Sequence, residues 1–117
     1  MKSFCKILAE INEKRKKYFD NPLFYAKKIK SIVSKKLPGA RILLFGSAVE
    51  GNLRPGSDID ILIISPDIPS DIFSLAKIKL EIKNKFSDAP FEIHLATPDE
   101  FENWYKNFVK HNFKEVV

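Results

Sequence analysis

Apolar residues recur every three or four positions in the first third of the chain, which predicts two amphipathic helices. The first is expected over residues 3–18. Its apolar positions are Phe4, Ile7, Leu8 and Ile11. Asn21 and Pro22 should start the second helix, because Asn caps free N–H groups and Pro fits the first helical position. Gly39 follows a proline and should end it.

The apolar pattern then changes to short runs that predict strands. Three strands are expected, over residues 41–45, 58–64 and 91–96. Three further helices are expected, over residues 48–53, 70–86 and 98–112, and Thr97 with Glu100 forms a capping box before the last one. This order predicts an α/β domain, in which helices flank a small mixed sheet of at least three strands.

Length and composition agree with one ordinary domain. The chain has 117 residues, of which 44% are hydrophobic and 30% charged. It should divide into a helical part (1–38), a core (40–97) and a C-terminal helix (98–112). No apolar run approaches the ~20 residues of a membrane span, the amphipathic N-terminus does not resemble a signal peptide, and the single cysteine, Cys5, excludes an internal disulfide. A cytoplasmic protein is expected.

The net charge of +5 is unevenly distributed. Residues 1–41 contain 12 Lys or Arg and 3 Asp or Glu, whereas residues 42–117 contain 8 and 12. Such asymmetry indicates either a nucleic-acid or other acidic partner for the basic half, or simply solvated helix faces. The basic run has no interleaved aromatic residues that would stack on RNA bases, which favours the second interpretation.

Gly46 and Ser47 follow the first predicted strand. Gly46 has no Cβ and would let a ligand approach the backbone closely. Ser47 would begin a short helix, where free N–H groups and a hydroxyl suit phosphate. We expect a phosphate-binding corner at this point, although an ordinary strand-to-helix turn would have the same residues.

Asp58 and Asp60 are two positions apart on the second predicted strand, so their side chains should emerge on one face. The isoleucines between and after them should define the opposite, core face. Two adjacent carboxylates repel each other unless a partner neutralises them, and divalent cations are their natural partner. A pair of Mg²⁺ ions would suit in-line phosphoryl transfer, whereas a solvated strand edge is the simpler alternative.

The third predicted strand contributes a third acid, Glu92, which alternates with apolar residues and shares a face with His94. Beside Asp58 and Asp60, it would bind metal and accept a proton from an attacking hydroxyl. An exposed edge-strand position is the alternative for Glu92. For His94, a local hydrogen bond competes with a catalytic or nucleotide-binding role.

The run Gly46-Ser47, ten residues, then Asp58-x-Asp60 resembles the motif of the DNA polymerase β-like nucleotidyltransferase superfamily. The surrounding LFGSAVEGNLRPGSDIDILI resembles its minimal nucleotidyltransferase (MNT) branch. The resemblance covers about residues 40–97.

The resemblance implies an Mg²⁺-dependent enzyme that transfers a nucleoside monophosphate from an NTP, with ATP expected, to a hydroxyl. Gly46 and Ser47 would then bind the triphosphate, and Asp58, Asp60 and Glu92 would form the metal-binding catalytic triad. Many minimal members are antitoxins encoded beside a HEPN-domain toxin, and some adenylylate that toxin. A HEPN-type protein is therefore the expected partner.

The sequence departs from the family pattern in ways that leave other functions open. Ala48 and Glu50 replace the arginines that often follow Gly-Ser, with Arg54 as the nearest basic residue, and Glu92 replaces a frequent Asp. A non-catalytic module that neutralises a HEPN partner by covering it is one alternative. RNA nucleotidyl addition, with the basic helices steering RNA, is another.

Overall fold

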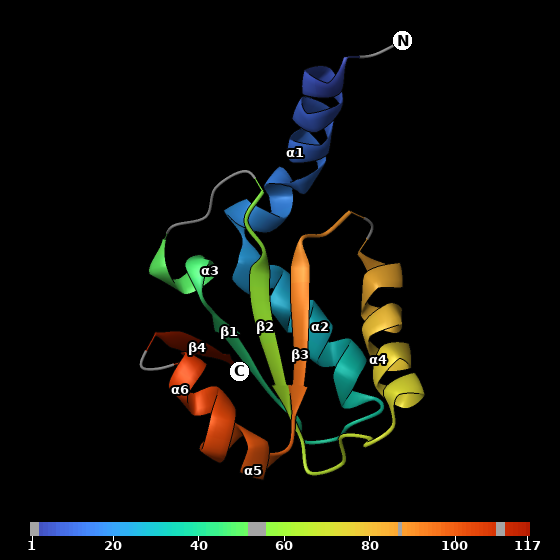
Figure 1. Ribbon diagram of the computed structural model, residues 1–117, viewed down its shortest axis with the longest axis vertical. Coiled ribbons are helices and arrows are strands. Elements are labelled where there is room, and N and C mark those ends of the chain that lie inside the picture. The colour runs from blue at the N-terminus through green and yellow to red at the C-terminus, as the bar shows by residue number, and fades with distance from the viewer. Residues whose placement is uncertain (1–2, 52–55, 87, 110–111) are drawn as a thin grey trace.

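The protein is built on a four-stranded mixed sheet, as seen in a computed structural model that describes residues 3–51, 56–86, 88–109 and 112–117 (Figure 1). The strands are β1 (Arg41–Phe45), β2 (Ile59–Ile64), β3 (Phe91–Ala96) and β4 (Phe113–Val116). Their order is β3-β2-β1-β4, with β1 antiparallel to β2 and β4, and β2 parallel to β3. The expected α/β class with a small mixed sheet is confirmed.

Helices surround this sheet close to the expected positions. They are α1 (Phe4–Asp20), α2 (Pro22–Ser34), α3 (Ser47–Glu50), α4 (Ile72–Lys85), α5 (Pro98–Glu100), the π-helix η1 (Phe101–Tyr105) and α6 (Lys106–Val109). Thr97 and Glu100 form the predicted capping box. Asn21 occupies the N-cap position of α2 but makes no capping hydrogen bond with its side chain.

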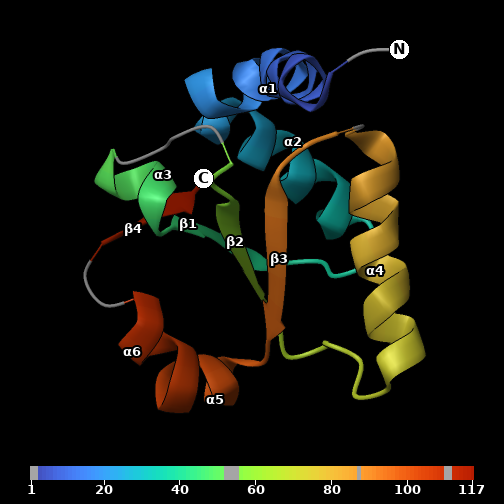
Figure 2. The ribbon, with the colours of Figure 1, turned by 45° about the horizontal axis from the view of Figure 1, so that its top comes forward.

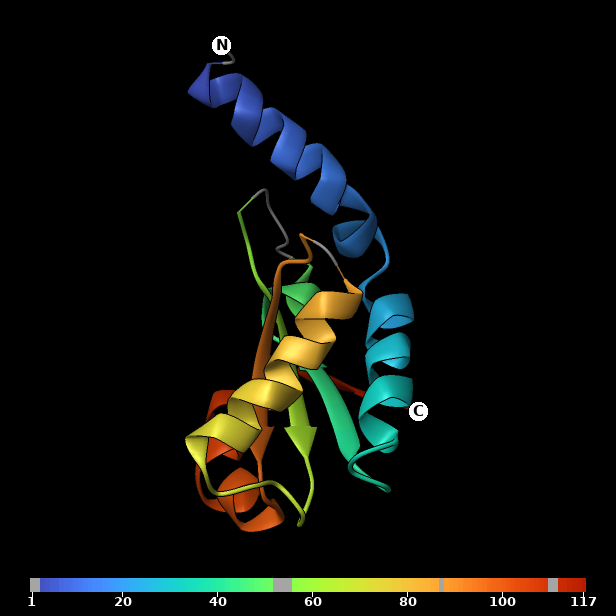
Figure 3. The same ribbon diagram turned by 90° about the vertical axis from the view of Figure 1, so that its right-hand side faces the viewer.

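Both faces of the sheet are covered, but by different elements. α2 and α4 lie on one face and pack against Ile59, Ile61 and Ile63 of β2, so the predicted core side is confirmed (Figure 3). On the other face, the start of η1 buries Phe101 against Leu62 in a smaller cluster. The second face is thus apolar near the C-terminal end of β2. Polar side chains can therefore lie on this face near the N-terminal end of β2.

The helix expected over 98–112 is present as one continuous run, α5, η1 and α6, with a π-helical stretch in the middle (Figure 2). The described helical turns end at Val109, and residues 113–116 form β4 on the edge of β1. The polar residues of β4 concealed this strand in the sequence. Arg41 donates hydrogen bonds to the Glu115 carboxylate, which lowers the pKa of that carboxyl, and Val116 is buried.

Helix α1 projects away from the sheet (Figures 1 and 3). Only Tyr18 of its 17 residues is buried, whereas Phe4 is 73% exposed and Ile7 and Leu8 are 42% exposed. The apolar side predicted for this helix is therefore uncovered at its N-terminal end. Within the described part of the chain, no helix is both long and apolar enough to cross a membrane.

Candidate active site

The turn after β1 places the backbone of Gly46 next to the carboxylate of Asp60. Gly46 has φ 71° and ψ −144°, a conformation essentially restricted to glycine. A Cβ added at Gly46 would lie 2.5 Å from Oδ2 of Asp60. The glycine at this position thus serves two purposes: it allows the turn, and it makes room for the Asp60 carboxylate.

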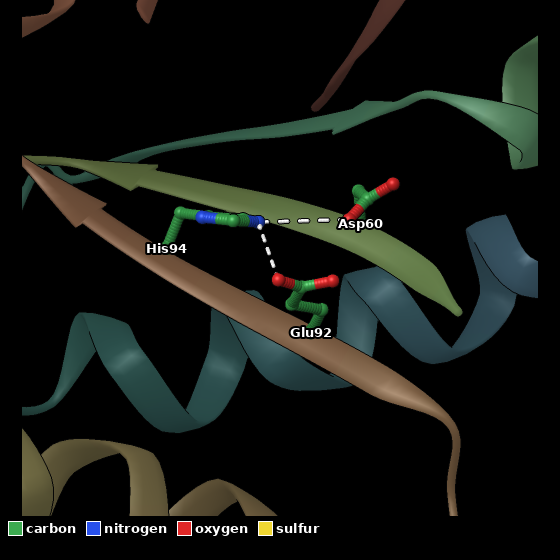
Figure 4. Close-up of side chains that lie close together, drawn as sticks. All are labelled: Asp60, Glu92 and His94. Atoms are coloured by element: carbon green, nitrogen blue, oxygen red, sulfur yellow. Dashed lines mark ion pairs between the residues drawn. The ribbon is translucent and has the colours of Figure 1, made fainter.

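The pairing of β2 with β3 brings together acids that are 32 positions apart in the chain. Asp60 is directly opposite Glu92, and Leu62 is opposite His94. Since side chains alternate along a strand, Asp60, Glu92 and His94 all emerge on the second face of the sheet (Figure 4). One ligand atom from each of the three lies within 4.8 Å of the others.

His94 is closer to the acids than the sequence indicated. Its Nε2 lies 3.5 Å from Oδ1 of Asp60 and 3.8 Å from Oε1 of Glu92 (Figure 4). Its ring contacts Phe45 and Tyr105, with centroid separations of 5.5 and 6.1 Å. The alternation of Glu92 and His94 on β3 was the available signal, because it placed the imidazole on the same face as the third acid.

Burial raises the pKa of Asp60, and the nearby Glu92 charge acts in the same direction, while His94 opposes both. The side chain of Asp60 is 24% exposed, compared with 53% for Glu92. The ionised form of Asp60 is therefore less favourable here than in water. A bound cation would relieve this penalty, so the donor set fits the divalent metal that the sequence predicted.

Asp58, the other predicted aspartate, lies apart from this group. β2 begins at Ile59, so Asp58 precedes the strand, and its side chain is exposed. It lines a hollow of about 270 Å³ beside β3 and α4, together with Glu92, Lys79 and Lys83. The structure thus brings Asp60 and Glu92 together, with Asp58 at the margin next to Glu92.

Ser47 begins α3, and its side chain is half-buried. Because α3 is a single turn, its dipole is small, and phosphate binding there would depend on backbone N–H groups and the Ser47 hydroxyl. Ala48, Val49 and Glu50 occupy the rest of this turn. Arg54, the nearest basic residue in the sequence, lies outside the described residues.

The raised pKa of Asp60 predicts a pH dependence of stability without metal. The folded state holds the Asp60 proton more tightly than the unfolded chain does, so Asp60 lowers the unfolding free energy as pH rises through its folded pKa. Relative to Asp60→Asn, the wild type should therefore lose stability from about pH 4 upward. Denaturant unfolding of both proteins in EDTA between pH 4 and pH 7 measures this difference. A constant difference would contradict it.

The comparison with known families decides the assignment. The family model for a nucleotidyltransferase domain matches residues 26–115, which include β1, β2, β3, most of β4, Gly46 and all three acids. The chain belongs to the nucleotidyltransferase domain family. Its members transfer a nucleotidyl group and typically use an NTP and a divalent metal, as expected from an acid cluster beside a glycine turn.

Two solved structures share this nucleotidyltransferase fold. One, a "putative nucleotidyltransferase", is 37% identical with a TM-score of 0.63, and the match covers 78% of this chain and 96% of the other. The second, a "putative nucleotidyltransferase" from Sulfolobus solfataricus, is 22% identical with a TM-score of 0.57, covering 87% and 85%. The second likeness shows the fold alone. No curated protein matched the chain.

Proposed function

We propose that this nucleotidyltransferase transfers AMP from ATP to a hydroxyl on a partner protein, and that it acts as the antitoxin of a HEPN/MNT pair. The supporting observation is the meeting of Asp60 and Glu92 across β2 and β3, with the Gly46 backbone held against Asp60. Two acids next to a turn whose closest residue, Gly46, has no side chain would bind a metal and a triphosphate together.

The transfer is a single displacement at phosphorus. The acceptor oxygen bonds to the α-phosphorus, the bond from that phosphorus to the bridging oxygen breaks, and pyrophosphate leaves. Mg²⁺, when bound, would supply charge neutralisation for the phosphates. Asp60 and Glu92 would hold it, and Asp58, which lines the same hollow as Glu92, would contribute at the margin. Gly46 and Ser47 bind the triphosphate.

Glu92 is suited to receive the acceptor's proton. It is the most exposed member of the group, with 53% of its side chain accessible, so an incoming hydroxyl can reach it. Asp60 is more buried and lies between Gly46 and His94, which suits a fixed ligand rather than a mobile base. Glu92→Gln should therefore reduce transfer by about a hundredfold or more, the usual range for general acid–base catalysis.

The direct test incubates the protein with labelled ATP, CTP, GTP or UTP, Mg²⁺ and candidate acceptors. Label on a co-purified protein from ATP supports the proposal, and its loss in Asp60→Asn and Glu92→Gln assigns it to this site. Label on RNA would instead support RNA nucleotidyl addition. Absence of transfer to any acceptor would favour the non-catalytic module, which the replacement of arginines by Ala48 and Glu50 keeps in consideration.

The uncovered side of α1 supports a protein partner over RNA. Phe4, Ile7 and Leu8 are exposed along one stretch of the projecting helix. Apolar side chains contribute affinity when another protein buries them, whereas RNA binding depends mainly on cations and stacking. The lysines of α1 would complement acidic groups on that partner.

A charge placed on this helix should weaken partner binding without affecting the fold. The double variant Phe4→Glu with Ile7→Glu should lower affinity for a co-purified partner at least about tenfold, since both apolar contacts would be lost. The double variant Phe73→Glu with Ile72→Glu is the matched control, because it adds the same two charges at an aromatic residue and an isoleucine on α4 that are 89% and 79% exposed. Calorimetry measures the affinities, and equal weakening by both variants would contradict a role for α1.

A further inference from the structure

His94 presents a buried nitrogen to the acids. Its Nε2 is inaccessible and has no hydrogen-bond partner within the described residues. Contacts with Phe45 and Tyr105 hold the ring from the β1 side and from η1. The nitrogen therefore faces Asp60 and Glu92 because the ring is packed that way, without a hydrogen bond that would fix it (Figure 4).

The distances around Nε2 are too long for hydrogen bonds and suitable for a shared ion. The separations of 3.5 Å to Asp60 and 3.8 Å to Glu92 exceed the usual hydrogen-bond range of about 2.7–3.2 Å. A buried polar nitrogen without a partner is unfavourable, and an ion bound at that atom would remove the penalty. Ligands bound to one ion at about 2.0–2.2 Å lie roughly 3–3.6 Å apart, which is close to both separations.

We propose that Nε2 of His94 is a metal ligand, and that the site formed by Asp60, Glu92 and His94 prefers a divalent transition ion such as Mn²⁺ to Mg²⁺. Mg²⁺ binds oxygen ligands almost exclusively, whereas imidazole suits transition ions. Two carboxylates with one imidazole form a donor set that Mn²⁺ accepts more readily than Mg²⁺. The inference shares the site of the proposed transferase function but concerns only which ion the site selects.

Electron paramagnetic resonance of the full chain loaded with Mn²⁺ alone tests the ligand directly. Bound Mn²⁺ should show electron spin-echo modulation from an imidazole ¹⁴N, and the modulation should change when histidine is labelled with ¹⁵N. This readout uses the wild-type protein and does not depend on whether a variant folds. Manganese bound without nitrogen coupling would overturn the proposal and would leave His94 as a neighbour of the acids that does not bind the ion.

Substitution of each histidine in turn identifies which residue supplies the metal-bound nitrogen. His94→Gln should remove the ¹⁴N modulation and weaken Mn²⁺ binding at least about tenfold, with a smaller effect on Mg²⁺. His111→Gln, which replaces the chain's other histidine, is the matched control and should retain both. Unchanged modulation in His94→Gln would overturn the assignment. Labelled-ATP transfer with Mg²⁺ is measured in parallel, so failure of the ligand proposal is distinguished from failure of the transferase function.

Discussion

Asp60→Asn is expected to lower nucleotidyl transfer by at least about a hundredfold while leaving the fold intact. Asp60 lies between the Gly46 turn and the Glu92–His94 pair, so it is the acid that adjoins both of them. Removing one charged group that stabilises a phosphoryl-transfer transition state typically costs several kcal/mol of barrier. Labelled-ATP transfer under single-turnover conditions measures the loss.

The same substitution should stabilise the metal-free protein. Burial and Glu92 both raise the pKa of Asp60, so its negative charge is unfavourable in the folded state at neutral pH. The neutral amide removes that penalty, and the thermal midpoint in EDTA should rise or stay unchanged. Saturating Mg²⁺ should raise the midpoint of the wild type but not that of Asp60→Asn.

Asp67→Asn provides the control for both measurements. Asp67 is exposed and follows the end of β2, so replacing it changes the net charge equally without touching the site. Asp67→Asn should retain nucleotidyl transfer and the rise of the thermal midpoint with Mg²⁺. If Asp67→Asn and Asp60→Asn lose activity to the same degree, the assignment of Asp60 to the reaction is wrong.

Gly46→Ala is expected to damage both stability and activity. The backbone at φ 71° and ψ −144° disfavours any side chain, which costs about 1–3 kcal/mol. The added methyl would also lie 2.5 Å from the Asp60 carboxylate and force it to move. We therefore expect a lower unfolding free energy, weaker metal binding and transfer reduced at least about a hundredfold.

Gly39→Ala separates these two effects. Gly39 also has a positive φ, of 77°, but no described atom lies within 4 Å of where its Cβ would be. It should lose stability through backbone strain alone and retain activity per folded molecule. Denaturant unfolding and metal titration of both variants make the comparison. If Gly46→Ala and Gly39→Ala retain metal binding equally, the site does not require a residue without a side chain beside Asp60.

The sequence predicted much of this site because strand periodicity is local. Alternation placed Asp60 opposite the isoleucine face of β2 and placed Glu92 with His94 on one face of β3, and both placements are confirmed. Gly46 after the first apolar strand was likewise recognised from its neighbours in the chain. The roles of these residues in catalysis and metal binding stay predictions, for which the experiments above are designed.

Local sequence patterns could not predict which residues meet across the sheet. No periodicity specifies that Asp60 pairs with Glu92 in parallel register, since strand pairing depends on how the connecting helix α4 packs. The edge strand β4 has two charged residues between two apolar ones and so lacks strand alternation, which is why no strand was expected there. It forms by pairing with β1, where Arg41 binds Glu115, and no local pattern specifies that pairing.

The sequence by itself therefore determined the α/β class, the family motif and the face on which Asp60 and Glu92 emerge, because these follow from residue type and spacing. Only the tertiary structure decided how close the groups come. It set Asp58 before the strand, placed Asp60 against Gly46, and turned the nitrogen of His94 toward two carboxylates. Those distances depend on strand register and on the aromatic packing around His94, which involve residues far apart in the chain.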